Sequence, residues 1–377
     1  MKIQRYIEQK IATKIGKQKV LLLYGSRRTG KTTIIENISK LHEANTLMLL
    51  GEDIQVSEYL QNRTVANYKA LIGEKKLVII DEAQAIPNIG KILKLMIDSI
   101  KGITIIATGS SSFDLINDAG EPLVGRQLEF QLFPLAQVEF SALENRLESL
   151  NELPNRLIYG GYPELIHLHT LAEKEDYLKS LVNSYLLKDI LALTAIKGAD
   201  VLLRLLILLA FQVGRQVSTV ELGNSLQINK ETVDRYLDLL SKVFIIYPLG
   251  GFSQNLRKEV SKSKKWYFYD NGIRNALINN FSPLTYRNDI GALWEQWMIS
   301  ERMKLNAAND YHPNYFFWRT YDGQEIDLLE IDSQQKMQGL EFKWSKANSK
   351  IPVAFAKAYP DAVWNEVSKE SYFDWVV

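Results

Sequence analysis

The stretch GSRRTGKT, at positions 25–32, holds the residues best suited to chemistry. It matches the phosphate-binding pattern G-x-x-x-x-G-K-[ST] in full, follows the apolar run KVLLLYG and opens a helical pattern. Gly25 and Gly30 would let the backbone turn so that its N–H groups point at phosphate oxygens. Lys31 would reach the β- and γ-phosphates of ATP, and the hydroxyl of Thr32 would bind Mg²⁺. The predicted nucleotide-binding residues of this loop are Gly25, Ser26, Arg27, Arg28, Thr29, Gly30, Lys31, Thr32 and Thr33.

Two acids, Asp81 and Glu82, end the apolar run LVIIDE at positions 77–82. The run predicts a buried strand, and ligands of open α/β sheets bind at the carboxyl ends of the strands. Asp81 would hold the Mg²⁺ through water, and Glu82 would polarise the water that attacks ATP. The alternative is an ordinary solvated pair of acids.

Two further catalytic candidates are a serine and an arginine. The run ITIIATGSSS ends in hydroxyls, so Ser110 or Ser111 could sense the γ-phosphate, although a plain turn is the alternative. Arg126 lies just before the run QLEFQLFPL. It could act as an arginine finger on a neighbouring subunit, stabilising charge in the transition state. A surface or salt-bridged arginine is the alternative.

The C-terminal stretch GQEIDLLEIDSQQKMQGLEFKWSK carries a second chemical pattern, D…E-x-K. Residues two apart on a strand face the same side, so Glu341 and Lys343 would point together, and a hairpin would bring Asp327 beside them. Asp327 and Glu341 could hold Mg²⁺ or Mn²⁺, which would activate water to cut DNA. Lys343 would orient or deprotonate that water. The alternative is a solvent-facing hairpin. Glu325 could be a spare ligand, but we interpret it as a solvated acid.

Short apolar runs predict the elements that would position these residues. The runs at 19–25, 46–51, 77–81, 103–109 and 127–135 read as buried strands. The sequence between the third and fourth runs has helical periodicity, which gives a βαβ unit and hence a parallel sheet. We therefore expect an α/β fold built around a parallel-sheet core.

The rest of the chain predicts three further parts. The pattern is helical from about 137 to 198, and three helices followed by two strands from 199 to 283 suggest a winged helix. A helix around LWEQWMISERMKL and three strand-like runs follow. The expected domains are a P-loop ATPase core at 1–140, a helical lid at 141–198, a winged helix at 199–283 and an α/β nuclease-like domain at 284–377.

The expected winged helix has one feature that favours DNA binding and one that does not. Its third helix, KETVDRYLDLLSKV, follows Asn229 as N-cap and carries charges of both signs on its exposed face. The loop SQNLRKEVSKSKK could hold DNA phosphates. Its cations are Arg257, Lys258, Lys262, Lys264 and Lys265. The alternatives are a solvated loop, or a winged helix that only packs against the ATPase.

The motifs GSRRTGKTT, LVIIDEAQ, IIATGSSS and GR before F-x-L-x-P-L resemble prokaryotic AAA-superfamily P-loop ATPases of the archaeal-ATPase type, relatives of the STAND group. The likeness continues through GGYPEL and YLLKDI. It implies that Gly161 and Pro163, in the lid, lie close to the nucleotide base. It also implies a winged helix and a C-terminal domain similar to restriction endonucleases, in which Glu295 would be a further acidic site residue.

Composition limits the class of protein. A chain of 377 residues is long enough for two to four domains, and 45 Lys plus Arg nearly cancel 44 Asp plus Glu, which argues against a protein coated in nucleic acid. The absence of cysteine excludes disulfides and thiolate zinc sites. We find no apolar signal-peptide core, and the most apolar run, 201–213, is too short to span a bilayer. We expect a cytoplasmic protein without a membrane partner.

The sequence thus favours an ATP-binding and ATP-hydrolysing AAA-type protein. Its nucleotide state would be coupled to a C-terminal region that binds DNA and acts as a metal-dependent nuclease with a second Mg²⁺ or Mn²⁺. The alternative is a nucleotide-gated DNA- or protein-binding switch whose nuclease-like domain is inactive. An oligomer or a protein partner is compatible with both hypotheses.

Overall fold

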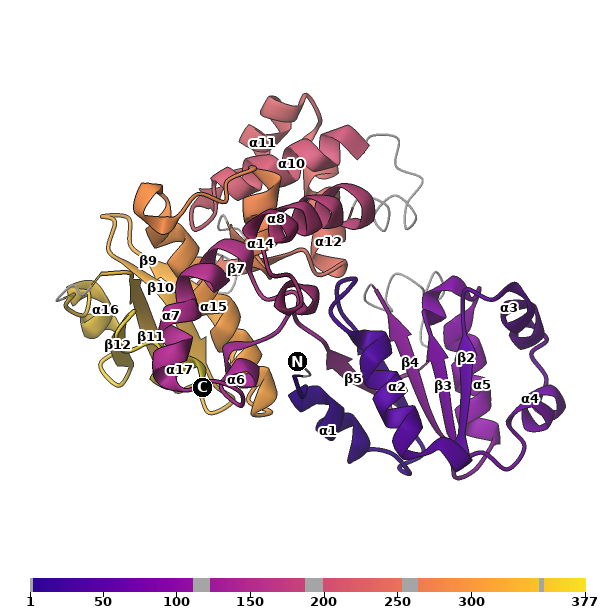
Figure 1. Ribbon diagram of the computed structural model, residues 1–377. Helices are drawn as coiled ribbons and strands as arrows, with labels where there is room; N and C mark the ends of the chain where they lie inside the picture. The colour runs from indigo at the N-terminus through magenta and orange to yellow at the C-terminus, as the bar shows by residue number, and fades with distance from the viewer. Residues whose placement is uncertain (1–2, 111–122, 187–198, 253–263, 346–348) are drawn as a thin grey trace. The chain divides into compact units, whose positions relative to one another are not determined.

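The computed structural model describes residues 3–110, 123–186, 199–252, 264–345 and 349–377 (Figure 1). The chain forms two compact units. The N-terminal unit comprises Lys2–Phe133 and Lys242–Phe244, and the C-terminal unit comprises Pro134–Ser241 and Ile245–Val377. No helix within the described ranges is long and apolar enough to cross a membrane.

The N-terminal unit contains a parallel five-stranded sheet in the order β2-β3-β4-β1-β5 (Figure 1). Its strands are β1 (Val20–Tyr24), β2 (Thr46–Leu50), β3 (Leu77–Asp81), β4 (Thr104–Gly109) and β5 (Gln127–Gln131). Every residue of β3 and β4 is buried, as in a sheet covered on both faces. The predicted α/β class with a parallel sheet is therefore confirmed.

Helices cover both faces of this sheet. They are α1 (Tyr6–Ala12), α2 (Lys31–Leu41), α3 (Ile54–Gln61), α4 (Val65–Ile72) and α5 (Ile89–Ser99), with 3₁₀ turns at Glu43–Asn45 and Ala83–Ala85. Side chains of β1 alternate between two cores: Leu21 and Leu23 join α1 and α2, whereas Val20 and Leu22 join α4 and α5. The carboxyl ends of β1, β3 and β4 consequently share one edge of the sheet.

The first part of the C-terminal unit is mostly helical. It contains α6 (Gln137–Phe140), α7 (Arg146–Tyr159), a 3₁₀ turn at Pro163–Ile166, α8 (Leu171–Ser180) and a π-helix at Leu181–Leu186. It continues with α10 (Ala199–Phe211), β6 (Gln216–Val217), α11 (Thr219–Leu226) and α12 (Lys230–Lys242). The amide of Thr232 donates to Asn229 at 2.8 Å, so Asn229 caps α12.

Among the residues that the structure describes, the remaining elements of this unit are strands and four helices, with a 3₁₀ turn at Leu284–Tyr286. The helices are α14 (Asn271–Leu277), α15 (Ile290–Ala308), α16 (Val353–Ala358) and α17 (Phe373–Val376). The strands are β7 (Ile246–Gly251), β8 (Lys264–Phe268), β9 (Asn314–Arg319), β10 (Glu325–Ile331), β11 (Met337–Lys343) and β12 (Val363–Ser368).

These six strands and β6 form one mixed seven-stranded sheet in the order β12-β11-β10-β9-β7-β8-β6. The parallel pair β7 and β9, in which Gly250 lies opposite Phe316, joins the strands of the expected winged helix to those of the expected nuclease-like domain. The sheet therefore runs across the boundary predicted at 283/284. The four-domain division stays a prediction.

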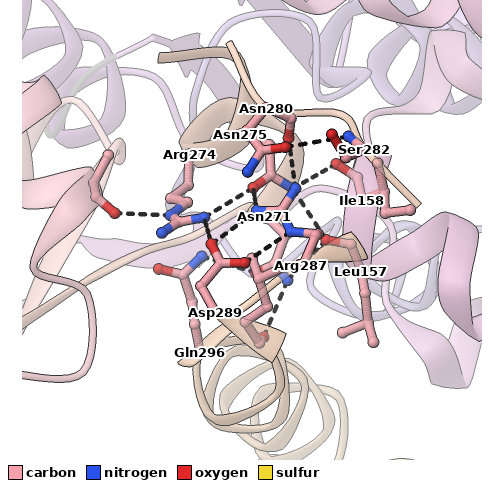
Figure 2. Close-up of polar contacts among 12 residues, drawn as sticks. Leu157, Ile158, Asn271, Arg274, Asn275, Asn280, Ser282, Arg287, Asp289 and Gln296 are labelled. Atoms are coloured by element: carbon pink, nitrogen blue, oxygen red, sulfur yellow. Dashed lines mark hydrogen bonds and ion pairs between the residues drawn. The ribbon is translucent and has the colours of Figure 1, made fainter. Parts of the chain in front are cut away.

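A buried polar network joins the end of α7 to the starts of α14 and α15 (Figure 2). The side chain of Asn275 donates to the carbonyls of Leu157 at 3.2 Å and Ile158 at 2.7 Å, which α7 leaves without helical partners. Arg287 donates to both carboxylate oxygens of Asp289 at 2.8 Å. Burial alone would raise the pKa of Asp289, but its hydrogen bonds to Arg287 and Arg274 outweigh burial and lower it. This network fixes the end of α7.

Candidate functional site

The phosphate-binding loop joins β1 to α2 at the carboxyl edge of the parallel sheet. A Cβ atom at Gly25 would lie 2.1 Å from the backbone oxygen of Leu132, so only glycine fits there. Gly30 adopts a left-handed φ of 97° at the start of α2. The N-terminus of α2 therefore follows the loop directly, which favours binding of an anion.

Lys31 is held against its own loop. Its ammonium donates to the carbonyl oxygens of Gly25 at 2.8 Å and Ser26 at 3.1 Å, and the residue is only 4% exposed. The positive charge is thus kept beside the backbone that would bind phosphates, as the motif predicts.

Thr32 and Asp81 meet across the sheet edge. The Thr32 hydroxyl donates to Asp81 Oδ2 at 3.0 Å, and the Thr108 hydroxyl donates to Asp81 Oδ1. A hydroxyl and a carboxylate oxygen are ligands that Mg²⁺ accepts, so this pair fits the predicted ion. The structure brings these two residues together although 49 positions separate them.

Glu82 and Ser110 lie at the ends of neighbouring strands. The amide N–H of Glu82 donates to the Thr108 hydroxyl at 3.0 Å, and Glu82 has a left-handed φ of 48°. The Gln84 side chain donates to the Glu82 carboxylate and, at 3.4 Å, to the Ser110 hydroxyl. Thr108 and Gln84 were not predicted as site residues, although LVIIDEAQ and IIATGSSS contain them. Ser111 lies outside the described residues.

Arg126 lies at the opposite edge of the sheet from the phosphate-binding loop. It precedes β5, whose first residue pairs with Val20 at the start of β1. Its guanidinium forms an ion pair with Asp98 at 2.5 Å, and both side chains are about two-fifths exposed. The structure does not bring Arg126 to the nucleotide site of its own chain, and a role on a neighbouring subunit stays a prediction.

Gly161 and Pro163 belong to the C-terminal unit. The N–H of Gly161 donates to Asp270 at 2.7 Å, and its carbonyl accepts from the amide of Leu135 at 2.7 Å. Pro163 opens a 3₁₀ turn. Their expected contact with the nucleotide base stays a prediction.

The four residues of the predicted nuclease site gather in the C-terminal unit. Asp327 accepts the N–H of Phe342 at 2.8 Å, and Lys343 pairs with Glu341 at 2.6 Å. Burial raises the pKa of Asp327 well above its usual value, and the charges of Glu295 and Glu341 raise it further. Burial likewise raises the pKa of Glu341. Strands β10 and β11 and helix α15 thus bring three acids and Lys343 close together.

Lys265 enters this cluster from β8 and corrects two expectations. Its ammonium pairs with Glu295 at 3.1 Å and Glu325 at 2.5 Å, and its side chain is only 2% exposed. Lys265 was expected on an exposed basic loop, but it lies on a buried strand because these carboxylates neutralise it. Glu325 was expected to be solvated, but it is ion-paired with Lys265. The cations predicted at 257, 258 and 262 lie outside the described residues.

Tyr267, two residues along the same strand, completes the cluster. Its hydroxyl donates to Glu295 at 2.5 Å. Burial alone would lower the pKa of Lys265, but the charges of Glu295 and Glu325 outweigh it and raise the pKa. The alternation of Lys265 and Tyr267 in KKWYFYD was the sequence signal for a shared face.

The acids of the C-terminal cluster are largely paired, although the buried Oε2 of Glu341 has no hydrogen-bond partner among the described residues. Within the ranges that the structure describes, no group of three or more His, Asp or Glu side chains could hold a metal ion. The carboxylates of Glu295, Glu325 and Glu341 face lysine ammonium groups, and Asp327 accepts a backbone N–H. The second metal predicted at Asp327 and Glu341 stays a prediction.

Comparisons with known proteins divide the chain into three matched regions. Residues 17–141 match the family model "AAA domain". Residues 150–284 and 290–370 match "Domain of unknown function (DUF8612)" and "Domain of unknown function (DUF4143)".

Several curated relatives are similar over most of the chain, and each is described as an uncharacterized protein. A protein of Mycobacterium tuberculosis is 27% identical over 327 residues, covering 86% of this chain and 70% of that protein. A Haemophilus influenzae protein is 25% identical over 378 residues, covering 95% and 87% respectively. A Methanocaldococcus jannaschii protein is 25% identical over 387 residues, covering 97% and 84%.

Two solved structures are distantly similar to this chain. The Thermotoga maritima RuvB Holliday junction branch migration motor has 16% identity and a TM-score of 0.33, covering 65% of this chain and 89% of that one. A chain from the structure of Drosophila ORC bound to AT-rich DNA and Cdc6 has 13% identity and a TM-score of 0.28, covering 73% and 90%. The AAA match over residues 17–141, together with the parallel sheet and its phosphate-binding loop, supports an AAA-type P-loop ATPase domain in the N-terminal unit.

Proposed function

We propose that the N-terminal unit binds ATP with Mg²⁺ and hydrolyses it, and that its nucleotide state controls the C-terminal unit. The observation that carries this proposal is the hydrogen bond of 3.0 Å between Thr32 and Asp81, beside the retained ammonium of Lys31. Two distant segments thereby supply the oxygen ligands and the cation that a nucleoside triphosphate requires.

Each site residue has a defined task in this mechanism. The loop N–H groups and the N-terminus of α2 bind the phosphates, and Lys31 neutralises their charge. Thr32 and Asp81 would hold Mg²⁺, which supplies further neutralisation of the phosphate charge. Glu82 orients and polarises the attacking water, while Gln84 holds the Glu82 carboxylate beside Ser110.

Replacing Lys31 with alanine should weaken ATP binding about a hundredfold or more, because the phosphates lose a buried cation. Titration calorimetry with ATP and Mg²⁺ measures the change. Lys40→Ala is the matched control, since Lys40 is an exposed cation on the same helix, and it should bind as the wild type does. Equal affinity of Lys31→Ala and wild type would contradict the proposed site.

For the C-terminal unit, we propose a binding region whose charge cluster is structural rather than nucleolytic. Lys265 and Lys343 support this choice, since they neutralise carboxylates that a catalytic metal would require. The partner is DNA or a protein. The exposed face of α12 carries charges of both signs, at Lys230, Asp234 and Arg235, and so does not favour either partner. The second candidate is a metal-dependent nuclease, which the proximity of Glu295, Asp327 and Glu341 favours.

DNA cleavage distinguishes the two candidates. We expect no cleavage of single- or double-stranded DNA with Mg²⁺ or Mn²⁺, with or without ATP, because the carboxylates are paired with lysines. Gel electrophoresis of end-labelled DNA measures the outcome. Cleavage that is lost in Lys343→Ala and kept in Lys336→Ala, whose exposed lysine precedes β11, would instead establish the nuclease.

A further inference from the structure

Arg5, just before α1, reaches the phosphate-binding loop from outside the motif. One guanidinium nitrogen, Nη1, donates to the carbonyl oxygen of Thr29 at 2.8 Å. The other, Nη2, donates to the carbonyl oxygen of Phe133 at 2.6 Å. The residue is only 6% exposed, and a Cβ atom at Gly30 would lie 3.9 Å from Nη1. Arg5 therefore lies against the loop immediately before Lys31.

The two carbonyls that Arg5 binds belong to different parts of the N-terminal unit. Thr29 lies within the loop, and Phe133 ends the long segment of the unit. The segment leading to Phe133 also touches the start of the loop, since the amide of Leu132 donates to the Tyr24 carbonyl at 2.7 Å. The planar fork of an arginine can serve two carbonyls at once, whereas a lysine ammonium is a single point of charge.

The residues after Pro134 are fixed within the C-terminal unit. The amide of Leu135 donates to the Gly161 carbonyl at 2.7 Å, and Lys304 donates to the Leu135 carbonyl at 3.3 Å. The amide of Gln137 donates to Glu301 at 2.6 Å. Each side of Pro134 is thus bonded to its own unit, and proline itself restricts φ.

We propose that Arg5 is a positioning residue that ties the phosphate-binding loop to the hinge at Pro134. A change in loop shape on nucleotide binding moves the Thr29 carbonyl, and the shared guanidinium passes that change to Phe133. The proposal rests on ATP binding by the N-terminal unit. It adds a route by which a structural change at the nucleotide site reaches Phe133. It requires no residue of the motif to contact the C-terminal unit.

Hydrogen exchange of segment 128–140 with and without ATP and Mg²⁺ tests the route. In the wild type, saturating ATP should change the exchange rate of this segment severalfold. Arg5→Lys and Arg5→Gln should bind ATP about tenfold more weakly, since a buried charge-assisted hydrogen bond is lost. At saturating ATP, both variants should no longer transmit the change to the segment. Arg63→Lys, an exposed arginine of the same unit, is the control.

The outcomes separate this inference from the proposed function. Wild type that binds no ATP would overturn the proposed function. Wild type that binds ATP without altered exchange at 128–140 would overturn the hinge route, whatever the variants do. Variants that melt at a lower temperature but keep the wild-type ATP affinity and exchange response would show that Arg5 is merely structural.

Discussion

Replacing Glu82 with glutamine should lower the rate of ATP hydrolysis about 10²–10⁴-fold while ATP binding changes little. Glutamine keeps the size of the side chain but cannot accept a proton from the attacking water. The geometry around the residue should persist, because its backbone N–H is bonded to the Thr108 hydroxyl and not to its own side chain. The substitution therefore removes the chemical step and leaves the phosphate-binding loop intact.

Phosphate release measures the hydrolysis rate, and gel filtration with labelled ATP shows whether the variant retains uncleaved nucleotide. Glu36→Gln is the matched control, since Glu36 is an exposed acid on α2, and it should hydrolyse ATP at the wild-type rate. A Glu82→Gln variant with unchanged turnover would assign the catalytic base to another residue. Loss of ATP binding in the same variant would mean that Glu82 supports the loop itself.

The fold of the N-terminal unit could be predicted because its signals are local. Each buried parallel strand is a continuous apolar run, and the parallel arrangement places the carboxyl ends of β1, β3 and β4 at one edge. That rule and the loop motif assigned Thr32 and Asp81 to the same Mg²⁺, and the two residues are hydrogen-bonded despite their separation in sequence. The supporting contacts of Thr108 and Gln84 depend on side-chain directions, which strand patterns do not specify.

The C-terminal cluster depends on pairings between distant segments. Lys265 was predicted both in the basic wing loop and at the start of the strand KKWYFYD, which matches β8 at Lys264, but its ion pairs were not predicted. Its burial depends on the acids that α15 and β10 present on the opposing surface. Arg5 had no sequence signal either, since its partner Phe133 lies 128 positions away. Long-range neutralisation of charge, rather than local propensity, determines these positions.

Replacing Lys265 with methionine should destabilise the C-terminal unit by about 3–5 kcal/mol, because removing one partner of a buried ion pair leaves the other charge uncompensated. Glu295 and Glu325 would both lose their ammonium partner, and Asp327 would feel stronger repulsion. Methionine preserves most of the apolar stem beside the Phe317 ring, so lost packing contributes little. Urea unfolding followed by tryptophan fluorescence measures the loss.

Lys264→Met is the matched control, since Lys264 precedes Lys265 on the same strand and is exposed. It should change stability by no more than about 0.5 kcal/mol. A Lys265→Met variant as stable as this control would mean that the acids find other partners.

The same variant also tests whether Lys265 and a divalent cation compete for the acids of the C-terminal cluster. Without Lys265, carboxylate oxygens become available to a divalent cation, so Mn²⁺ added without nucleotide should raise the melting temperature of Lys265→Met by binding the folded state. The wild type and Lys264→Met should not respond, because the buried ammonium already occupies the acids. If Mn²⁺ stabilises the wild type as strongly as the variant, Lys265 and the metal do not compete, and the nuclease hypothesis regains its metal site.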